Sequence, residues 1–128
     1  VSVNNPQKVP LLDIETLSAI SRVAKNHDFM IKLVDGYVAN AQNLIEQIRV
    51  ALTHKKYGDI SDLAHSLHGS SRSIGASRLA IIAEKLSRFM KTENHFMAQT
   101  HISELTPEFT QTRFALYDFL NGKNSAAL

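Results

Sequence analysis

A run of apolar side chains spaced three and four residues apart is the feature of this sequence that most constrains the fold. The run covers roughly 28–53 and consists of Met30, Leu33, Val34, Tyr37, Val38, Ala41, Leu44, Ile45, Ile48 and Leu52. Because an α-helix turns every 3.6 residues, this spacing gathers the side chains on one face. The sequence therefore predicts one long amphipathic helix here, with Gly36 tolerated inside it.

Glycine and proline are scarce, at five and three residues, and similar patterns fill the chain between them. They predict a short first helix over about 13–24, which Asp13 can cap by accepting a hydrogen bond from a free backbone N–H. A third helix is expected to begin at an Asp59 cap and to end near Ile74. Gly75 then suits the left-handed position that terminates a helix.

Two further helices complete the pattern. Ser77 is the expected cap of a fourth helix, whose apolar side chains are Leu79, Ile82, Ala83, Leu86, Phe89 and Met90. A fifth helix reaches about Asn121 on a pattern of Ile102, Leu105, Phe109, Thr112, Leu116 and Phe119. Pro107 either kinks this helix or restarts it, since proline is comfortable at a first helical position.

The predicted fold class is all-α. Short connections between long helices force consecutive helices to lie antiparallel, which gives an up-down antiparallel four-helix bundle with a short additional N-terminal helix over one end. At 128 residues the chain is long enough for one domain with a real core. We expect a linker over 1–12, the helical bundle over 13–122 and a flexible tail over 123–128.

Composition narrows the classes of function. The chain has no cysteine, which excludes disulfides and thiolate chemistry. Its 14 basic and 12 acidic residues are mixed along the sequence, so no basic stripe indicates binding to nucleic acid. No apolar run approaches the roughly 18 residues of a membrane span. The sequence contains no glycine-rich phosphate loop, so it gives no indication of an ATP site.

The third predicted helix carries polar side chains on the face away from its own apolar stripe. On a helical wheel, the positions within about 60° of Leu63 are Ile60, Leu67, Ser70 and Ile74. The opposite arc, between about 140° and 240°, holds His65, His68, Gly69 and Arg72, and we expect it to face solvent. A glycine inside a helix costs roughly 0.5 to 1 kcal/mol relative to alanine. Close approach of another surface to the His65 imidazole would compensate for that cost.

The residues alone leave several interpretations of this stripe. A lone helix histidine is most often an ordinary surface residue. A metal site is disfavoured because Asp62, His65 and His68 point outward, whereas helical bundles build metal sites toward their interior. A hydrolytic triad lacks an oriented base. Serine packing and an ordinary charged surface explain the neighbouring Ser70, Ser71, Ser73, Arg78, Lys85 and Arg88, although the last three could also flank a docking surface. No shared spacing suggests a role for His27, His54, His95 and His101.

A resemblance adds a sharper interpretation. The segment reads Ala64-His65-x-Leu67-x-Gly69-Ser70-Ser71-x-x-Ile74-Gly75-Ala76-x-x-Leu79. This arrangement resembles the signature of histidine phosphotransfer (HPt) domains, the bacterial modules of multistep phosphorelays in two-component signal transduction. The likeness is strongest over about 59–86, and the helix layout extends it over about 28–121.

The resemblance implies that His65 accepts a phosphoryl group from an aspartyl phosphate on a receiver (response-regulator) domain and passes it to another receiver. The resulting phosphohistidine makes the domain a carrier and not an enzyme. It needs no cofactor of its own, because the receiver supplies the acidic pocket and Mg²⁺. The implied context is a hybrid sensor kinase, membrane-anchored or not. We expect the domain itself to be cytoplasmic, monomeric and free of membrane contact.

One position departs from the family pattern. Members commonly have a lysine where this chain has His68, and that lysine helps to neutralise the phosphoryl oxygens. An imidazole is only partly cationic near neutral pH. We therefore predict that Arg72, one turn further along, carries more of the charge compensation. Replacing His68 with lysine should speed transfer or flatten its pH dependence.

The competing interpretation is a helical adaptor that binds a receiver or another partner without phosphotransfer. The presence of His65 argues against this adaptor, whereas the departure at His68 leaves room for it. In either case we expect the groove around Gly69 to dock the partner through an apolar patch with a polar rim.

Overall fold

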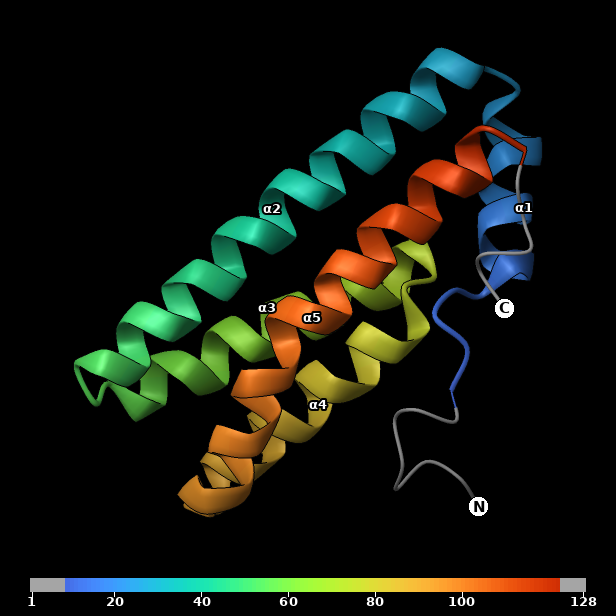
Figure 1. The fold of residues 1–128 in the computed structure, drawn as a ribbon. Coiled ribbons are helices and arrows are strands. Elements are labelled where there is room, and N and C mark those ends of the chain that lie inside the picture. The colour runs from blue at the N-terminus through green and yellow to red at the C-terminus, as the bar shows by residue number, and fades with distance from the viewer. Residues whose placement is uncertain (1–8, 123–128) are drawn as a thin grey trace.

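The computed structural model describes residues 9–122, which form five α-helices and contain no strand. The helices are α1 (Ile14–Ala24), α2 (His27–Thr53), α3 (Tyr57–Ile74), α4 (Ser77–Lys91) and α5 (His95–Leu120). Helices α2 to α5 run up and down as an antiparallel bundle, and α1 lies at the end where α2 begins and α5 finishes (Figure 1). This confirms the predicted all-α class and the four-helix bundle with a short N-terminal helix.

Packed structure begins within the range predicted as linker. Leu12, the last residue of that range, is only 2% exposed and belongs to the hydrophobic core. Residues 1–8 of the predicted linker and residues 123–128 of the predicted tail lie outside the described residues.

The predicted start of α1 and the predicted end of α3 are confirmed, and the two meet in space. The Asp13 side chain accepts hydrogen bonds from the Thr16 hydroxyl at 2.8 Å and the Thr16 backbone N–H at 3.3 Å, which lower the Asp13 pKa below its ordinary value. Gly75 ends α3 with a left-handed φ of 86°. Its carbonyl accepts from the Asp13 backbone N–H at 2.7 Å, so this junction anchors α1 beside the end of α3.

The predicted caps of α3 and α4 are wrong. Helix α3 is preceded by Lys56, and Asp59 instead lies in its first turn, where the helix dipole favours an anion. The earlier start is accompanied by packing, because the Tyr57 ring stacks on His95 with 4.2 Å between centroids. Helix α4 is preceded by Ala76, whose backbone N–H donates to the Ser71 carbonyl at 2.8 Å. This tight connection between the helices is closed by backbone hydrogen bonds and uses no side-chain cap.

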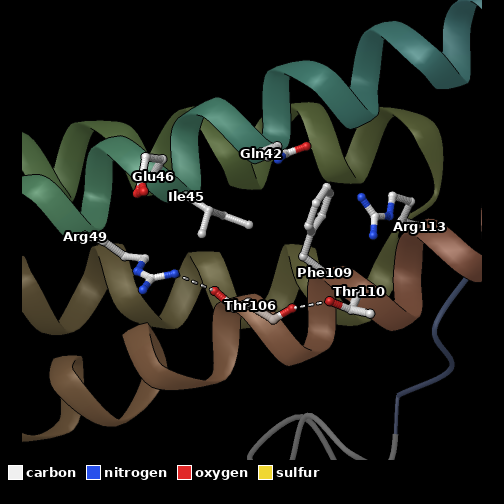
Figure 2. Close-up of a pocket in the computed structure, with 8 residues that line it drawn as sticks. All are labelled: Gln42, Ile45, Glu46, Arg49, Thr106, Phe109, Thr110 and Arg113. Atoms are coloured by element: carbon white, nitrogen blue, oxygen red, sulfur yellow. Dashed lines mark hydrogen bonds between the residues drawn. The ribbon is translucent and has the colours of Figure 1, made fainter.

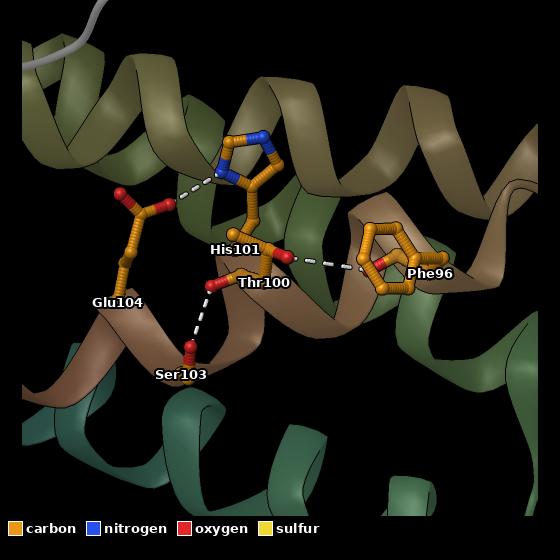
Figure 3. A network of polar contacts seen from close by, with 5 residues as sticks. All are labelled: Phe96, Thr100, His101, Ser103 and Glu104. Atoms are coloured by element: carbon orange, nitrogen blue, oxygen red, sulfur yellow. Dashed lines mark hydrogen bonds and ion pairs between the residues drawn. The ribbon is translucent and has the colours of Figure 1, made fainter.

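Helix α5 begins earlier than its apolar pattern indicated and continues through Pro107. Asn94 caps its start by accepting from the Met97 backbone N–H at 3.3 Å. A polar side chain at a core position hid this first part of the helix: His101 is buried and stacks on Phe89 with 5.5 Å between ring centroids. The His101 Nδ1 lies 2.6 Å from the Glu104 carboxylate (Figure 3). The ring therefore has a structural partner.

The buried face of α3 is rotated slightly from the predicted one. Ile60, Leu67 and Ile74 are buried as expected, whereas Leu63 and Ser70 are only partly buried. The additional buried residues are Ser61, Ala64 and Ser71. Small side chains let neighbouring helices approach closely, so the centre of the face moves toward them.

Two polar contacts fix α3 between its neighbours. The Tyr37 hydroxyl of α2 lies 2.6 Å from the Ser71 hydroxyl of α3, and both groups are buried. Toward α4, the Ser87 hydroxyl donates to the Ser61 carbonyl at 3.2 Å. Because α3 is held on both sides, the position of its outer face is well defined.

Candidate functional site

The outer face of α3 presents His65 at mid-helix. The side chain is exposed, and its ring forms no hydrogen bond within residues 9–122. Its nearest aromatic neighbour is His68, at 6.4 Å between ring centroids and an interplanar angle of 42°. A ring nitrogen of His65 can therefore present its lone pair to an incoming group without first breaking a contact.

His68 leans toward α4 and is less exposed than predicted. The ring is half-buried, and its Nδ1 lies 3.1 Å from the backbone carbonyl of Ala80. A carbonyl oxygen only accepts, so Nδ1 must be the donor. The remaining nitrogen, Nε2, then carries a lone pair in the neutral ring. Among the predicted outward residues, His65, Gly69 and Arg72 are exposed.

Helix α4 contributes a second set of charges beside His65. A shallow cavity of about 280 Å³ is lined by His65, His68, Glu84, Ser87, Arg88 and Lys91. Glu84, Arg88 and Lys91 are spaced four and three residues apart, which places them on one face of α4. Within the described chain neither Arg88 nor Lys91 forms a salt bridge. Both cations are therefore available to an anion at this cavity.

Arg88 was predicted as a possible flank of a docking surface, whereas Lys91 was not predicted. The signal was its position three residues after Arg88, which identifies a stripe only when the pairing of α3 with α4 is known. Arg78, named with Arg88, has another place: its Nε donates to the Val9 carbonyl at 2.8 Å, and Nη1 lies 3.6 Å from Glu108. Lys85 is partly buried and does not line the cavity.

Arg72 lies beside His68 but does not share the cavity that contains His65. It lines a neighbouring space of about 290 Å³, together with Asp13, His68, Gly75, Ser77, Ala80, Ile81 and Glu84. His68 and Glu84 border both spaces. The predicted share of Arg72 in charge compensation stays a prediction.

Gly69 has no internal packing reason to be glycine. A Cβ atom added there would meet nothing within 4 Å. The residue is exposed and lies inside α3, one turn after His65. The approach of an external surface at Gly69 stays a prediction.

An apolar groove of about 600 Å³ opens on the other side of the α3 ridge, between α1, α2 and α3. It is lined by Ile20, Phe29, Lys32, Leu33, Gly36, Tyr37, Asn40, Ser70, Ser73 and Ile74. Its α3 edge begins at Ser70, next to Gly69 in the chain. The Phe29 side chain is half exposed, at 50%. The groove and the cationic cavity thus flank the same helix.

A further cavity of about 280 Å³ lies between α2 and α5 (Figure 2). Its charged residues include Arg49, whose Nη1 is 3.5 Å from the Thr106 hydroxyl, and Arg113, whose guanidinium lies 5.8 Å from the Phe109 ring centroid. No residue of α3 or α4 lines this space. It is separate from the histidine site.

The described residues contain neither a metal-binding cluster nor a membrane-spanning helix. No group of three or more His, Asp or Glu side chains among residues 9–122 is arranged to hold a metal ion. In the same part of the chain, none of the helices is long and apolar enough to cross a membrane.

Comparison with known proteins identifies the family. The profile of the Hpt domain matches residues 32–114, which is more than half of the chain. The chain belongs to the Hpt domain family. Its fold is similar to the crystal structure of histidine-containing phosphotransfer protein B (HptB) from Pseudomonas aeruginosa PAO1, with a TM-score of 0.81 and 22% identity over 90% of this chain and 98% of that chain. No curated protein matches the sequence significantly.

Membership of the Hpt family gives this chain a histidine phosphotransfer role in a phosphorelay. Hpt domains are phosphoryl carriers and not enzymes with their own ATP site, and they interact with receiver domains. The family match also covers all of α3, including His65 and the cationic cavity beside it.

Proposed function

We propose that this Hpt domain carries a phosphoryl group on His65, accepting it from the aspartyl phosphate of one receiver domain and passing it to another. The supporting observation is the exposed His65 ring, which has no competing hydrogen bond within residues 9–122 and borders a cavity with two cations. We further propose a monomeric, cytoplasmic carrier that belongs to a hybrid sensor kinase. The Mg²⁺ is held by the receiver.

The proposed transfer is a displacement at phosphorus. The lone pair of one His65 ring nitrogen forms the N–P bond, while the P–O bond to the receiver aspartate breaks and its electron pair leaves with the carboxylate. The other ring nitrogen keeps its proton, so the ring becomes a phosphorylated imidazolium and total charge is conserved. The second receiver reverses the step with its own aspartate. This chemistry depends on positioning and on charge stabilisation.

We propose that Arg88 and Lys91 of α4 share the charge compensation with Arg72. Arg88 and Lys91 line the cavity that contains His65, whereas Arg72 lies in the adjoining space. Opposite charges about 4 Å apart attract by roughly 1 kcal/mol in bulk water and roughly 4 kcal/mol at an effective dielectric constant of 20. Two cations across the cavity could thus replace much of what the family lysine supplies.

The receiver is proposed to dock on the ridge of α3 and in the apolar groove beside it. The groove has an apolar lining that includes Ile20, Phe29 and Leu33, and Lys32 stands among these residues. It shares α3 with His65, so a partner seated there spans the phosphoryl site. A receiver resting close to α3 at Gly69 would use the space that a side chain would fill.

A transfer assay tests the proposal directly. A receiver domain loaded with radiolabelled phosphate is mixed with the wild-type chain, with His65→Gln and with His54→Gln as a matched control. His54 is also exposed, but unlike His65 its Nδ1 lies 2.9 Å from a backbone carbonyl, that of Val50. We expect acid-labile label on the wild type and on His54→Gln, and none on His65→Gln.

The same experiment separates the carrier from a silent adaptor. An adaptor would bind the receiver, as measured by calorimetry, without acquiring label on any histidine. That result, or label that persists in His65→Gln, would reject the proposed function.

A further inference from the structure

We infer that His68 contacts the phosphoryl group of His65 only as an imidazolium, so that loading His65 draws one proton onto the Nε2 of His68. This inference rests on the proposed function, because it concerns the phosphorylated state of the same site. The domain would then be a proton-coupled carrier, in which pH controls the equilibrium for phosphoryl transfer to His65.

The contact with α4 sets the protonation pattern of the His68 ring. Its Nδ1 donates to the Ala80 carbonyl at 3.1 Å. A neutral imidazole has one N–H, which this hydrogen bond uses, so Nε2 offers a lone pair. A lone pair repels phosphoryl oxygens. Only the doubly protonated ring can keep the Ala80 hydrogen bond and also donate to the phosphoryl group.

The charges around His68 come from three segments. On α3 they are His65 and Arg72, on α4 they are Glu84, Arg88 and Lys91, and before α1 there is Asp13. In the unloaded domain, the permanent charges around the ring are therefore the three cations Arg72, Arg88 and Lys91 and the two carboxylates Asp13 and Glu84. A negative charge nearby favours the charged form of an imidazole, so a phosphoryl group with two negative charges favours the imidazolium.

The proton balance gives the pH dependence its sign. An imidazole is ordinarily protonated below about pH 6.5, so the coupling requires no proton uptake there. Above that pH each loading event takes one proton from solvent, and transfer to the next receiver returns it. Linkage then weakens the hold on the phosphoryl group by up to about tenfold per pH unit. A lysine at this position would remain charged and would remove the effect.

The first test compares transfer equilibria with one phosphorylated receiver as common donor. The wild type, His68→Lys and His68→Gln are measured between pH 6 and 8.5, with His54→Lys as the matched control. Dividing each value by that of His68→Lys removes the pH dependence of the receiver. We expect the wild-type ratio to fall at least fivefold from pH 6 to 8.5, with His54→Lys following the wild type and His68→Gln low and flat. A constant wild-type ratio would overturn the inference.

The second test needs no substitution at His68. Two-bond ¹H–¹⁵N NMR spectra of the wild type at pH 8 report which nitrogens of each histidine ring are protonated. We expect His68 to carry a proton on Nδ1 alone before loading and on both nitrogens after His65 is phosphorylated. A ring that stays neutral in a protein labelled at His65 rejects the proton coupling and leaves the carrier function intact. Failure to label His65 at all rejects both.

Discussion

At the residue scale, two glycines of the α3 segment have opposite effects on the stability of the fold. Gly69 lies in the helix, and an added Cβ would meet nothing within 4 Å. At Gly75, φ is 86° and an added Cβ would come within 3.0 Å of the Asp13 carbonyl. We predict that Gly69→Ala stabilises the fold by roughly 0.5 to 1 kcal/mol, whereas Gly75→Ala destabilises it by roughly 1 to 3 kcal/mol. Urea unfolding of the purified variants measures both free energies.

The same pair separates stability from function. Although Gly69→Ala is more stable, we expect it to lower receiver affinity, because its methyl group projects into the docking face. Gly58→Ala is the matched control, since Gly58 is also helical, exposed and without a neighbour within 4 Å of an added Cβ. Equal receiver affinities for Gly69→Ala and Gly58→Ala would contradict a close approach at Gly69.

The cations of α4 provide a second residue-scale prediction. We expect the double variant Arg88→Gln, Lys91→Gln to slow transfer to His65 by about tenfold, the effect of losing one to two kcal/mol of charge stabilisation. Lys85→Gln, on the same helix but outside the cavity, should transfer at the wild-type rate. Stopped-flow transfer from one labelled receiver gives these rates. An unchanged rate in the double variant would contradict the proposed role of Arg88 and Lys91 and would leave Arg72 to neutralise the phosphoryl group.

At the element scale, the contact between α2 and α3 depends on a buried hydroxyl pair. Burial raises the pKa of Tyr37 to about 12, while the hydrogen bond to Ser71 acts in the opposite direction. The folded-state pKa of Tyr37 lies above the unfolded value of 10.0. The contribution of the protonated Tyr37 hydroxyl to folding stability is therefore complete below pH 10 and is lost as pH rises through 12. The loss amounts to about 2 to 3 kcal/mol.

Denaturant unfolding between pH 8 and 12 tests this prediction. Tyr37→Phe should reduce the slope of unfolding free energy against pH above pH 10. Tyr117→Phe is the comparison, because the hydrogen bond to Asp35 raises the pKa of Tyr117 but its side chain is only partly buried. A Tyr37→Phe slope equal to that of the wild type would show that the Tyr37 hydroxyl is not sequestered between the helices.

The groove between α1, α2 and α3 gives the next prediction. Phe29→Ala should weaken binding of the receiver by about tenfold, because removing a partly buried aromatic contact costs on the order of 1 kcal/mol or more. Labelling of His65 by a small phosphoryl donor, which needs no docking, should be unchanged. Phe114→Ala removes an exposed phenylalanine from α5 and should leave both measurements as in the wild type. If Phe29→Ala also lost labelling by the small donor, Phe29 would be needed for folding and its proposed role in docking would be contradicted.

Sequence patterns located most of the elements because each helix carries its own local signal. The spacing of apolar residues located α2, Asp13 marked the start of α1, and Gly75 marked the end of α3. The starts of α3 and α5 were missed because tertiary contacts, the stack of Tyr57 on His95 and the buried His101, decide them. Such contacts leave no local pattern, whereas the Asn94 cap of α5 was a local signal that the apolar pattern did not include.

At the scale of the whole molecule, the bundle brings together parts of the site that lie on different helices. The histidine, the glycine and the outward face could be predicted because they share α3. Lys91 and the hydrogen bond from His68 to Ala80 could not, since both depend on how α3 packs on α4. A helical wheel describes a single helix, whereas the charged residues of this site lie on both α3 and α4.

The chain contains six histidines, and we propose that one of them, His65, carries the phosphoryl group. The most direct test is to load the wild-type protein from a phosphorylated receiver, digest it at alkaline pH and locate the phosphate by mass spectrometry. We predict one phosphate per chain, on the peptide that contains His65 and on the His65 ring itself. Phosphate on any other histidine, or an unmodified chain after the receiver has bound, would contradict the account.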